Sequence, residues 1–431
     1  MSITPEGITI EAGLVKRHLY NSQRIRLTSP ILHIGSAVSW LSPFEYVQTS
    51  DRVYLPQQNL LAKELLQRGA MSEYIQRIQD QQSLESLLSR VLGEDWQTTK
   101  SEGESIFPRH LQSQKWAERI TDLRPMIRNG MGQLYIPGSS IKGAIRTAIA
   151  YHLLKHGDRY NVPKQQDVSA IEKRLRESMG DLKRKAKFAD DQLFMNRLFH
   201  DFDLVYQDKT VSAREGPNTD FMRSVSVSDS QSLLPTKVVN TRGQSVYKNL
   251  PVAVEVLVSS HFPDGNAKYR ASIYTEMVRS VNTEFTLSVD QEMLSWFRHS
   301  AGMQIPFQSV EDILNICQEF AQEQWDFEHD YWENIKNKSN KDRNLNFDRI
   351  RTIYEPQQCQ FSLRVGWASG MAGTTVNMLL PDDLWAEVRD NCGIKAPGFE
   401  APKSRRTVVD KNGDIKLVPG WVKFNSAEPS C

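Results

Sequence analysis

The segment 135–150, which reads YIPGSSIKGAIRTAIA, constrains the fold of this chain more than any other stretch. Its first residues end an extended apolar run, and Pro137 followed by Gly138 does not continue a strand. Ser139 and Ser140 are residue types that favour the capping position of a helix. The residues beyond them repeat with the spacing of one buried helix face, at Ile141, Ile145, Ala148, Ile149 and Leu153. We therefore predict a strand, a tight turn and a helix capped by Ser139 or Ser140.

The start of this helix is a predicted anion site. The first backbone amides of a helix lack partners within it, and the helix dipole places positive charge beside them. Lys142 and Arg146 lie one helical turn apart and add two cations. Gly138 and Gly143 carry no side chain that would keep a phosphate from the backbone. A polyanion is the expected ligand, and the alternative is an ordinary capped helix in which glycine permits close packing.

The spacing of the two glycines also resembles the phosphate-binding loop of nucleotide hydrolases, GxxxxGK[ST]. Gly138 and Gly143 fit that spacing, but Ala144 stands where a lysine must reach the terminal phosphates. This class of nucleotide site is therefore excluded.

The overall charge of the chain provides little attraction for a polyanion. Its 431 residues include 53 Lys and Arg and 52 Asp and Glu, so the formal net charge is +1. Any nucleic-acid binding must therefore depend on local clusters of cations. A chain of this length is expected to form two or three domains.

The cysteines and the hydropathy pattern predict a soluble cytoplasmic protein. Cys317, Cys359, Cys392 and Cys431 are scattered and include no CxxC pair for a zinc or redox site. The N-terminus lacks the basic flank and apolar core of a signal peptide, and no apolar run approaches the roughly 18 residues that cross a bilayer. We expect reduced thiols, no cofactor and no membrane partner.

Period-two patterns predict strands on both sides of a helical block. Residues 25–34 form an expected strand that runs into a turn at Gly35, and residues 57–120 show helical periods. Alternation of apolar and polar residues then predicts an antiparallel meander over 221–229, 252–258, 269–273 and 285–289.

The last third of the chain mixes a helix with further strands. Ser309, with Asp312 three residues later, predicts the start of a helix through a variant of the capping box. A strand over 361–367 and a hairpin that joins 405–409 to 415–418 are also expected. Together these patterns predict an α+β fold.

Two pairs of residues could suggest catalysis, and both are weak signals. His152 and His156 lie one turn apart on the predicted helix, but no acid stands between them as in HExxH, and the sequence indicates no third ligand. His200 with Asp201 matches a dipeptide of phosphohydrolases, and a match of two residues is close to chance. We predict no metal site and no catalytic residues.

Several short motifs follow one another along most of the chain. They are TSPILHIG at 28–35, SPFEY at 42–46, IPGSSIKGAIR at 136–146, FMRSVSVSDS at 221–230, IYTEMV at 273–278, RVGWASG at 364–370 and PGWVKF at 419–424. The glycine-rich motif is highly specific, and the set resembles the RAMP proteins of CRISPR effector complexes. Its combination with HIG, SDS and the terminal GWV resembles in particular the fifth subunit of the type III-A Csm complex. The helical insertions carry no such signature.

The resemblance implies an α+β fold of two ferredoxin-like domains of the RNA-recognition type, with helical insertions. We place the N-terminal domain, which carries the glycine-rich loop, at 1–245 and the C-terminal domain at 246–431. Such proteins bind guide RNA (crRNA), cap the end of the complex that holds its 3′ part, and are associated with maturation of that end. The implied partners are crRNA, target RNA in the assembled complex and the other Csm subunits, especially the backbone RAMP subunit at the crRNA 3′ end.

The expected RNA contacts combine the glycine-rich loop with the end of the first strand and a track of arginines. Loop amides would hold phosphates without reading sequence, with Lys142 and Arg146 neutralising them, and Trp40, Trp367 and Trp421 are candidates for base stacking. The full set is His33, Gly35, Gly138, Ser139, Ser140, Lys142, Gly143, Arg146, Arg223, Arg364, Arg405 and Arg406.

The leading hypothesis is a non-catalytic RNA-binding subunit. The resemblance includes backbone subunits that cut target RNA with an aspartate in the loop after the HIG strand. Here that loop offers serines and Trp40, and its first acid is Glu45. One alternative is a metal-independent guide-RNA endonuclease that uses His33 as general acid or base. Another is a docking platform that recruits a host nuclease through the helical insertions.

Overall fold

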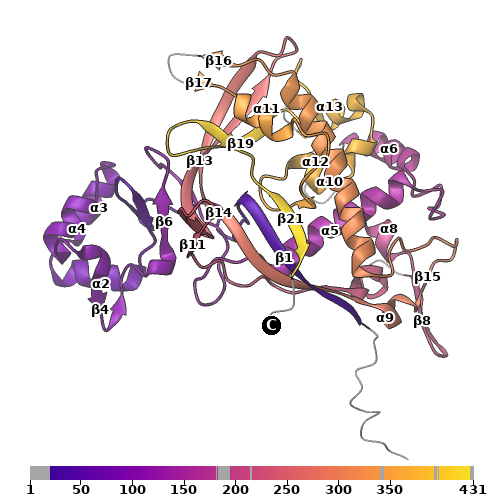
Figure 1. Ribbon diagram of the computed structural model, residues 1–431, viewed down its shortest axis with the longest axis horizontal. Helices are drawn as coiled ribbons and strands as arrows, with labels where there is room; N and C mark the ends of the chain where they lie inside the picture. Colours follow the sequence, from indigo (N-terminus) through magenta and orange to yellow (C-terminus); the bar gives the residue numbers. More distant parts are fainter. Residues whose placement is uncertain are drawn as a thin grey trace, which may run out of the picture.

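The computed structural model describes residues 20–180, 182, 195–213, 216–339, 344–392, 396 and 398–427. Over these residues the chain is a mixed α/β fold built on one large sheet. Most of the longer helices gather to one side of the sheet, and a separate helical group lies beyond its far edge (Figure 1).

Strand β14 (Ala267–Asp290) is the central strand of this sheet. β1 (Tyr20–Leu32) pairs with one of its edges and β13 (Leu250–His261) with the other, both antiparallel. Where β1 and β13 end, the short strands β7 (Leu123–Arg124) and β10 (Val225–Val227) pair with β14 in their place. One strand thus fixes the register of four others.

The remaining strands extend the sheet on both sides. They are β2 (Val47–Gln48), β3 (Arg52–Tyr54), β6 (Gln112–Lys115), β18 (Leu363–Arg364), β19 (Arg405–Val409), β20 (Ile415–Leu417) and β21 (Trp421–Ser426). The main order is β18-β21-β1-β14-β13-β6-β3-β2, and β19 pairs with β13 and β20.

The predicted strands are largely confirmed, with three corrections. The strand predicted over 361–367 is reduced to the two residues of β18, because the chain turns at Gly366, whose φ is +92°. The alternating patterns at 269–273 and 285–289 belong to the single strand β14. The strand predicted over 221–229 shrinks to β10, because Phe221–Ser224 form a short 3₁₀ turn in which Asp220 accepts a hydrogen bond from the Met222 amide. The hairpin predicted from 405 to 418 is present as β19 and β20.

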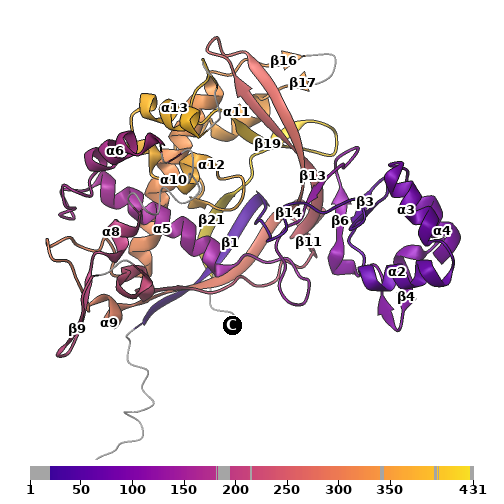
Figure 2. The same cartoon turned by 180° about the vertical axis from the view of Figure 1, so that it is seen from behind.

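Helices α5 (Gly138–Lys155) and α10 (Val310–Glu333) lie side by side in both views (Figures 1 and 2). The capping box predicted for α10 is confirmed, because Ser309 and Asp312 each accept a hydrogen bond from the other's amide. Both helices pack on the main core, the buried cluster that includes Leu27, Ile145, Val278, Val281, Leu287 and Phe320.

Side chains of β14 pack in two hydrophobic clusters, and the pattern of this packing changes at Ser280. Its φ is +52°, a left-handed conformation that residues other than glycine adopt at a cost. Before it, Val278 packs in the main core and Met277 in a second cluster with Val254. After it, Val281 packs in the main core. The alternation of side chains therefore shifts by one residue at Ser280.

The helical block expected over 57–120 is confirmed in part. A separate lobe, at the left of Figure 1, packs its helices around Trp96 and Phe107. The block is not helical throughout, because it also contains β6 and a hairpin of two short strands. Its elements are α2 (Gln58–Gln67), α3 (Met71–Gln79), α4 (Glu85–Leu92), β4 (Lys100–Ser101) and β5 (Glu104–Ser105).

Shorter elements complete the described chain. They are α6 (Val168–Glu177), α8 (Asn196–His200), β8 (Asp203–Tyr206), β9 (Lys209–Val211), β11 (Thr236–Val239), β12 (Ser245–Lys248), α9 (Gln291–Leu294), β15 (Phe297–Arg298), β16 (Lys338–Ser339), β17 (Asn344–Leu345), α11 (Asp348–Tyr354), α12 (Gly370–Thr374) and α13 (Asp382–Asn391).

Strands from both sides of the predicted boundary at 245/246 lie within one sheet. β1 and β10 precede this boundary, whereas β13, β14 and β21 follow it. The mixed class of the fold is confirmed, and a pair of ferredoxin-like domains divided between residues 245 and 246 stays a prediction. No helix in the described ranges has both the length and the apolar character needed to span a membrane.

Substitutions at Ser280 test the role of its backbone conformation. Ser280→Val should lower the free energy of unfolding by about 1–2 kcal/mol, because a β-branched residue is strained at positive φ. Ser280→Gly should stay close to the wild type, because glycine adopts this conformation freely. Thermal unfolding followed by circular dichroism measures both, and equal midpoints for the two variants would contradict the account.

Candidate nucleic-acid interface

The start of α5 is the first predicted RNA contact, and the structure places a carboxylate there. The helix begins at Gly138 directly after Pro137, so Ser139 and Ser140 lie within its first turn. The predicted serine cap was therefore wrong. Instead, Asp229 accepts a hydrogen bond from the Gly138 amide at 2.8 Å, and its negative charge interacts favourably with the helix dipole. An internal anion already occupies part of the position predicted for a phosphate.

Lys142 and Arg146 both have partners within the fold. Lys142 Nζ donates to the Val225 carbonyl oxygen at 2.7 Å, and burial lowers the pKa of this lysine. Arg146 donates to Asp220 Oδ2 at 2.6 Å, and its guanidinium lies 3.8 Å from the centre of the Phe199 ring. These contacts hold the segment before β10 against α5, so a phosphate would have to share both cations.

The two glycines of the loop differ in their surroundings. A Cβ at Gly138 would lie 2.2 Å from the carbonyl oxygen of Val227, so close packing requires glycine there. Gly143 is exposed, and a Cβ at that position would meet no atom within 4 Å. Close packing therefore explains why residue 138 is glycine, whereas no contact of the fold requires glycine at residue 143.

The predicted track of arginines divides into buried and exposed members. Arg364 and Arg405 are 4% and 6% exposed and share the carboxylate of Glu328 on α10, at 3.4 and 2.9 Å. They therefore tie β18 and β19 to α10. Arg223 is exposed and donates to the carbonyl oxygen of Asn218 at 2.6 Å.

His33 lies beneath the surface, directly after β1. It is 1% exposed, and its Nδ1 donates a hydrogen bond to the Glu276 carbonyl oxygen at 2.7 Å. Burial lowers the pKa of His33 to about 4, so the ring is neutral at neutral pH. Gly35, two residues later, is exposed.

Arg406 and Arg124 flank the ring of Trp367. Their guanidinium carbons lie 4.5 and 4.9 Å from its centre, and Arg124 also lies 4.5 Å from the ring of Trp40. Within the described ranges no carboxylate forms an ion pair with either arginine. Burial, then Arg124 and Arg364, lower the pKa of Arg406. The stack ends at Trp40, which is 54% exposed and available to a base.

A groove of about 840 Å³ lies along β1, β14 and the β11–β12 hairpin. Its cations are Lys248, Arg279 and Lys423, and none of the described residues that line it is acidic. Tyr247, also in its lining, is 48% exposed. A groove with cations and an aromatic ring but no carboxylate favours a polyanion such as a nucleic-acid backbone. We call it the basic groove.

Sequence reasoning missed the three cations of the basic groove and also Arg124. Lys423 lies within PGWVKF, and Arg279 directly follows IYTEMV, so each adjoined a recognised motif. Strand pairing brings them to one place, since Lys423 faces Thr28 across the ladder of β1 and β21. The spacing of these cations in the sequence does not indicate that they lie together in the fold.

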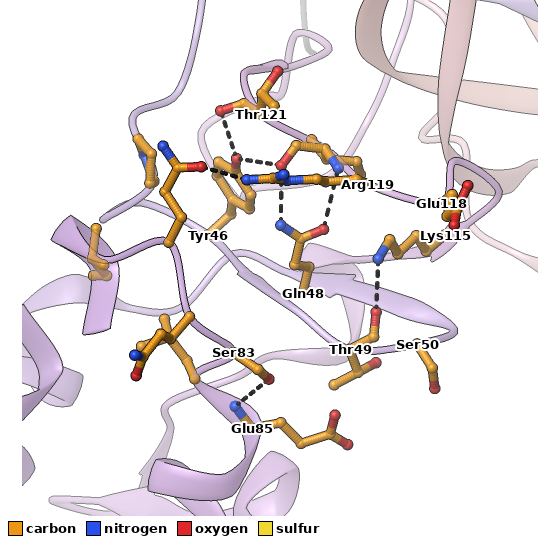
Figure 3. A pocket seen from close by; sticks show the side chains of 16 residues that line it. Tyr46, Gln48, Thr49, Ser50, Ser83, Glu85, Lys115, Glu118, Arg119 and Thr121 are labelled. Carbon is orange, nitrogen blue, oxygen red and sulfur yellow. Dashed lines mark hydrogen bonds between the residues drawn. The ribbon is translucent and has the colours of Figure 1, made fainter. Parts of the chain in front are cut away.

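A second hollow, of about 410 Å³, lies between β2 and the helical lobe (Figure 3). Its cations are Lys115, which donates to the Thr49 carbonyl oxygen at 3.2 Å, and Arg119. Glu85 and Glu118 line it as well. Because its charges are mixed, this hollow suits a polyanion less well than the basic groove does.

Alanine at each glycine of the loop separates packing from ligand binding. Gly138→Ala should destabilise the protein, because its Cβ meets backbone that cannot yield easily. Gly143→Ala should stabilise it by up to about 1 kcal/mol, because alanine favours a helix interior and finds open space. Melting temperatures give the comparison. A destabilised Gly143→Ala variant would show that the fold itself needs this glycine.

The comparisons with known proteins concern the whole chain. No curated protein matches the sequence of this chain. The fold resembles one chain of a "Cryo-EM structure of Csm-crRNA-target RNA ternary complex in type III-A CRISPR-Cas system", with 22% identity, a TM-score of 0.57 and coverage of 94% of this chain and 100% of that one. It also resembles the crystal structure of T. onnurineus Csm5, with 19% identity, a TM-score of 0.55 and coverage of 93% and 100%.

The family match is a finding from the sequence itself. The family model of the RAMP superfamily matches residues 24–365. These residues include most of β1, the glycine-rich loop, β13, β14 and α10. Since the match covers most of the sequence, the chain belongs to the RAMP superfamily.

Proposed function

We propose that this chain is a guide-RNA-binding subunit of a type III-A effector complex, without catalytic activity of its own. Membership of the RAMP superfamily and the fold shared with the two Csm structures support this proposal. One of those structures holds Csm subunits together with crRNA and target RNA. We propose the same classes of partner here.

The finer proposal places the chain at the 3′ end of crRNA, beside a backbone RAMP subunit, where it assists maturation of that end. The motifs that resemble the fifth Csm subunit support this position. The same resemblance supports two ferredoxin-like domains that contribute strands to the shared sheet.

The basic groove is the observation that carries RNA binding. Lys248, Arg279 and Lys423 can each meet a phosphate, and such contacts position a strand without reading its sequence. This suits a protein that must accept any guide. Tyr247 beside the groove and Trp40 at the end of the arginine stack offer exposed rings for bases.

The sequence-predicted contacts fit this proposal in two ways. Gly35, Ser139, Gly143 and Arg223 are exposed and can meet RNA directly. Four further members have side-chain partners inside the fold and act by shaping the surface. They are Lys142, Arg146, Arg364 and Arg405.

The burial of His33 supports a non-catalytic role. General acid–base chemistry requires an imidazole within hydrogen-bond reach of the scissile phosphate. His33 commits Nδ1 to a carbonyl oxygen, and its Nε2 is buried without a hydrogen-bond partner. The endonuclease alternative would need this side chain to reach the surface. Recruitment of a host nuclease stays an alternative that no contact of the described residues favours.

Removal of two groove cations tests RNA binding. Arg279→Ala combined with Lys423→Ala should weaken binding to guide RNA equally for all spacer sequences. It should also reduce the slope of log affinity against log salt by about 1.4, since each lost contact to a single strand removes about 0.7. Fluorescence anisotropy at several salt concentrations measures both effects.

The matched control removes two lysines outside the groove. Lys63→Ala combined with Lys173→Ala changes the net charge equally, and neither residue lines the groove. Its salt slope should equal that of the wild type. The same slope in both double variants would refute the groove as the RNA site.

Labelled precursor guide RNA separates the capping subunit from the endonuclease. The pure chain should leave the RNA intact, because the fold offers no exposed general base at His33. Complexes reconstituted without this chain should hold guides with untrimmed or loosely protected 3′ ends. Cleavage by the pure chain that disappears in His33→Ala would establish the endonuclease instead, and guides of normal length without the chain would remove the capping role.

A further inference from the structure

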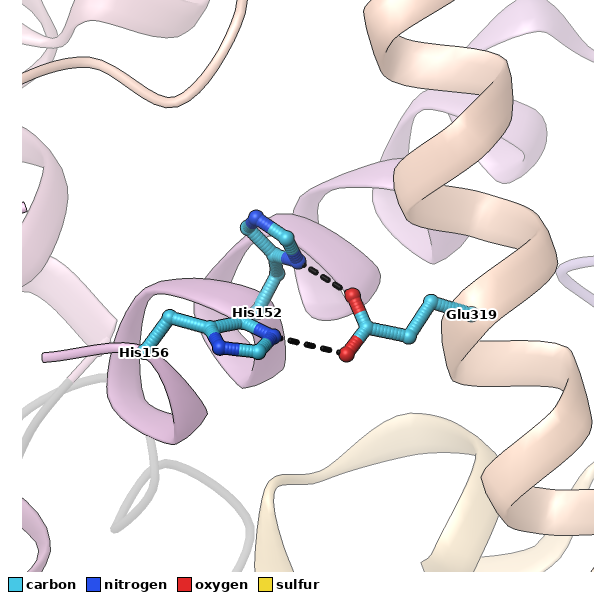
Figure 4. A group of neighbouring side chains, drawn as sticks. All are labelled: His152, His156 and Glu319. Atoms are coloured by element: carbon cyan, nitrogen blue, oxygen red, sulfur yellow. Dashed lines mark hydrogen bonds and ion pairs between the residues drawn. The ribbon is translucent and has the colours of Figure 1, made fainter. Parts of the chain in front are cut away.

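His152, His156 and Glu319 converge between the two helices that cover the main core (Figure 4). The histidines lie one turn apart on α5, and Glu319 reaches them from α10. One ligand atom from each residue lies within 4.8 Å of the other two. The sequence indicated no third ligand for this pair, because Glu319 follows His156 by 163 residues.

The carboxylate of Glu319 faces both imidazole rings. Its Oε2 lies 2.5 Å from His152 Nδ1, and its Oε1 lies 2.8 Å from His156 Nε2. Zinc binds such nitrogen and oxygen atoms at about 2.0–2.2 Å, so tetrahedral ligands stand about 3.4 Å apart. Opening each contact by less than about 1 Å would place an ion among the three ligands.

The surroundings of His152 fix its ring for this purpose. Tyr160 Oη lies 2.9 Å from His152 Nε2, so the opposite nitrogen, Nδ1, points at Glu319. Histidines that bind a metal usually hold their second nitrogen in such a hydrogen bond. The side chains of His156 and Glu319 are 34% and 26% exposed, which leaves a route from solvent and room for a water ligand.

Lys155 is the one cation seen at this carboxylate within the described residues. It donates to Glu319 Oε1 at 2.9 Å and to Glu323 Oε1 at 2.6 Å. When an ion binds Glu319, Lys155 keeps Glu323 as its partner. Replacement of Lys155 by the ion at Glu319 therefore leaves no buried charge unpaired.

We propose that His152, His156 and Glu319 form a zinc site in which water supplies the fourth ligand. Two imidazoles and one carboxylate form a donor set typical of zinc, whereas magnesium and calcium prefer oxygen ligands alone. The ion joins α5, whose first turn belongs to the glycine-rich loop, to α10, which carries the Glu328 carboxylate of the buried arginines. This role does not depend on RNA binding.

The test uses the full chain after removal of metal with a chelator. Isothermal titration with zinc should give one tight site per chain, and zinc should raise the melting temperature. Cobalt in the same site should show the visible absorption of a tetrahedral ion. His156→Gln and Glu319→Gln should each weaken zinc binding at least tenfold and abolish the cobalt bands. Both side chains are partly exposed, so these variants should fold, and circular dichroism checks this.

The matched control lies further along α10. Half-buried His329 forms a second group with the exposed Asp330 and Glu333, and His329→Gln should bind zinc like the wild type. Three results would overturn the proposal: a wild-type chain that takes up no stoichiometric zinc, unchanged binding in both His156→Gln and Glu319→Gln, or loss of binding in His329→Gln.

Discussion

Backbone pairing along β14 is the interaction on which the rest of the structure depends. Its 24 residues hold β1 and β7 on one edge and β13 and β10 on the other. At the left-handed residue Ser280 the alternation of side chains shifts by one residue, so Val278 before it and Val281 after it both pack in the main core. Arg279, Ser280 and Asn282 also line the basic groove. The packing of the core and the shape of the proposed RNA surface thus follow from one backbone constraint.

The cations of this protein differ in burial: some arginines are buried in the fold, whereas the cations of the basic groove lie at its surface. Moving a guanidinium into the interior costs several kcal/mol unless a carboxylate and hydrogen bonds compensate. Arg128 meets this condition at Glu276, with contacts of 2.6 and 2.8 Å. Burial favours the neutral form of Glu276, yet Arg128, Ser113 and the Met126 amide together lower its pKa. Such arginines stabilise the fold, whereas the groove cations keep their charge available at the surface.

Local patterns predicted the elements of this fold better than the partners of its side chains. The spacing from Ile141 to Leu153 identified α5, and Ser309 identified the start of α10, because a helix face and a cap involve neighbours in sequence. The carboxylates Asp229, Glu319 and Glu328 could not be assigned in this way. Each meets its partner only after distant elements pack. For this reason the glycine-rich loop was recognised as a site, while its internal anion and the basic groove were not.

The place of β21 in the sheet determines when the sheet can be completed during synthesis. β21 lies between β18 and β1, and Ser426 faces Ile25 across the ladder. The ribosome makes β1 first and β21 last among the described strands, so one edge of β1 stays unpaired while almost the whole chain is translated. Unpaired strand edges are templates for association with other chains. The nascent protein therefore exposes this edge of β1 until its final strand emerges.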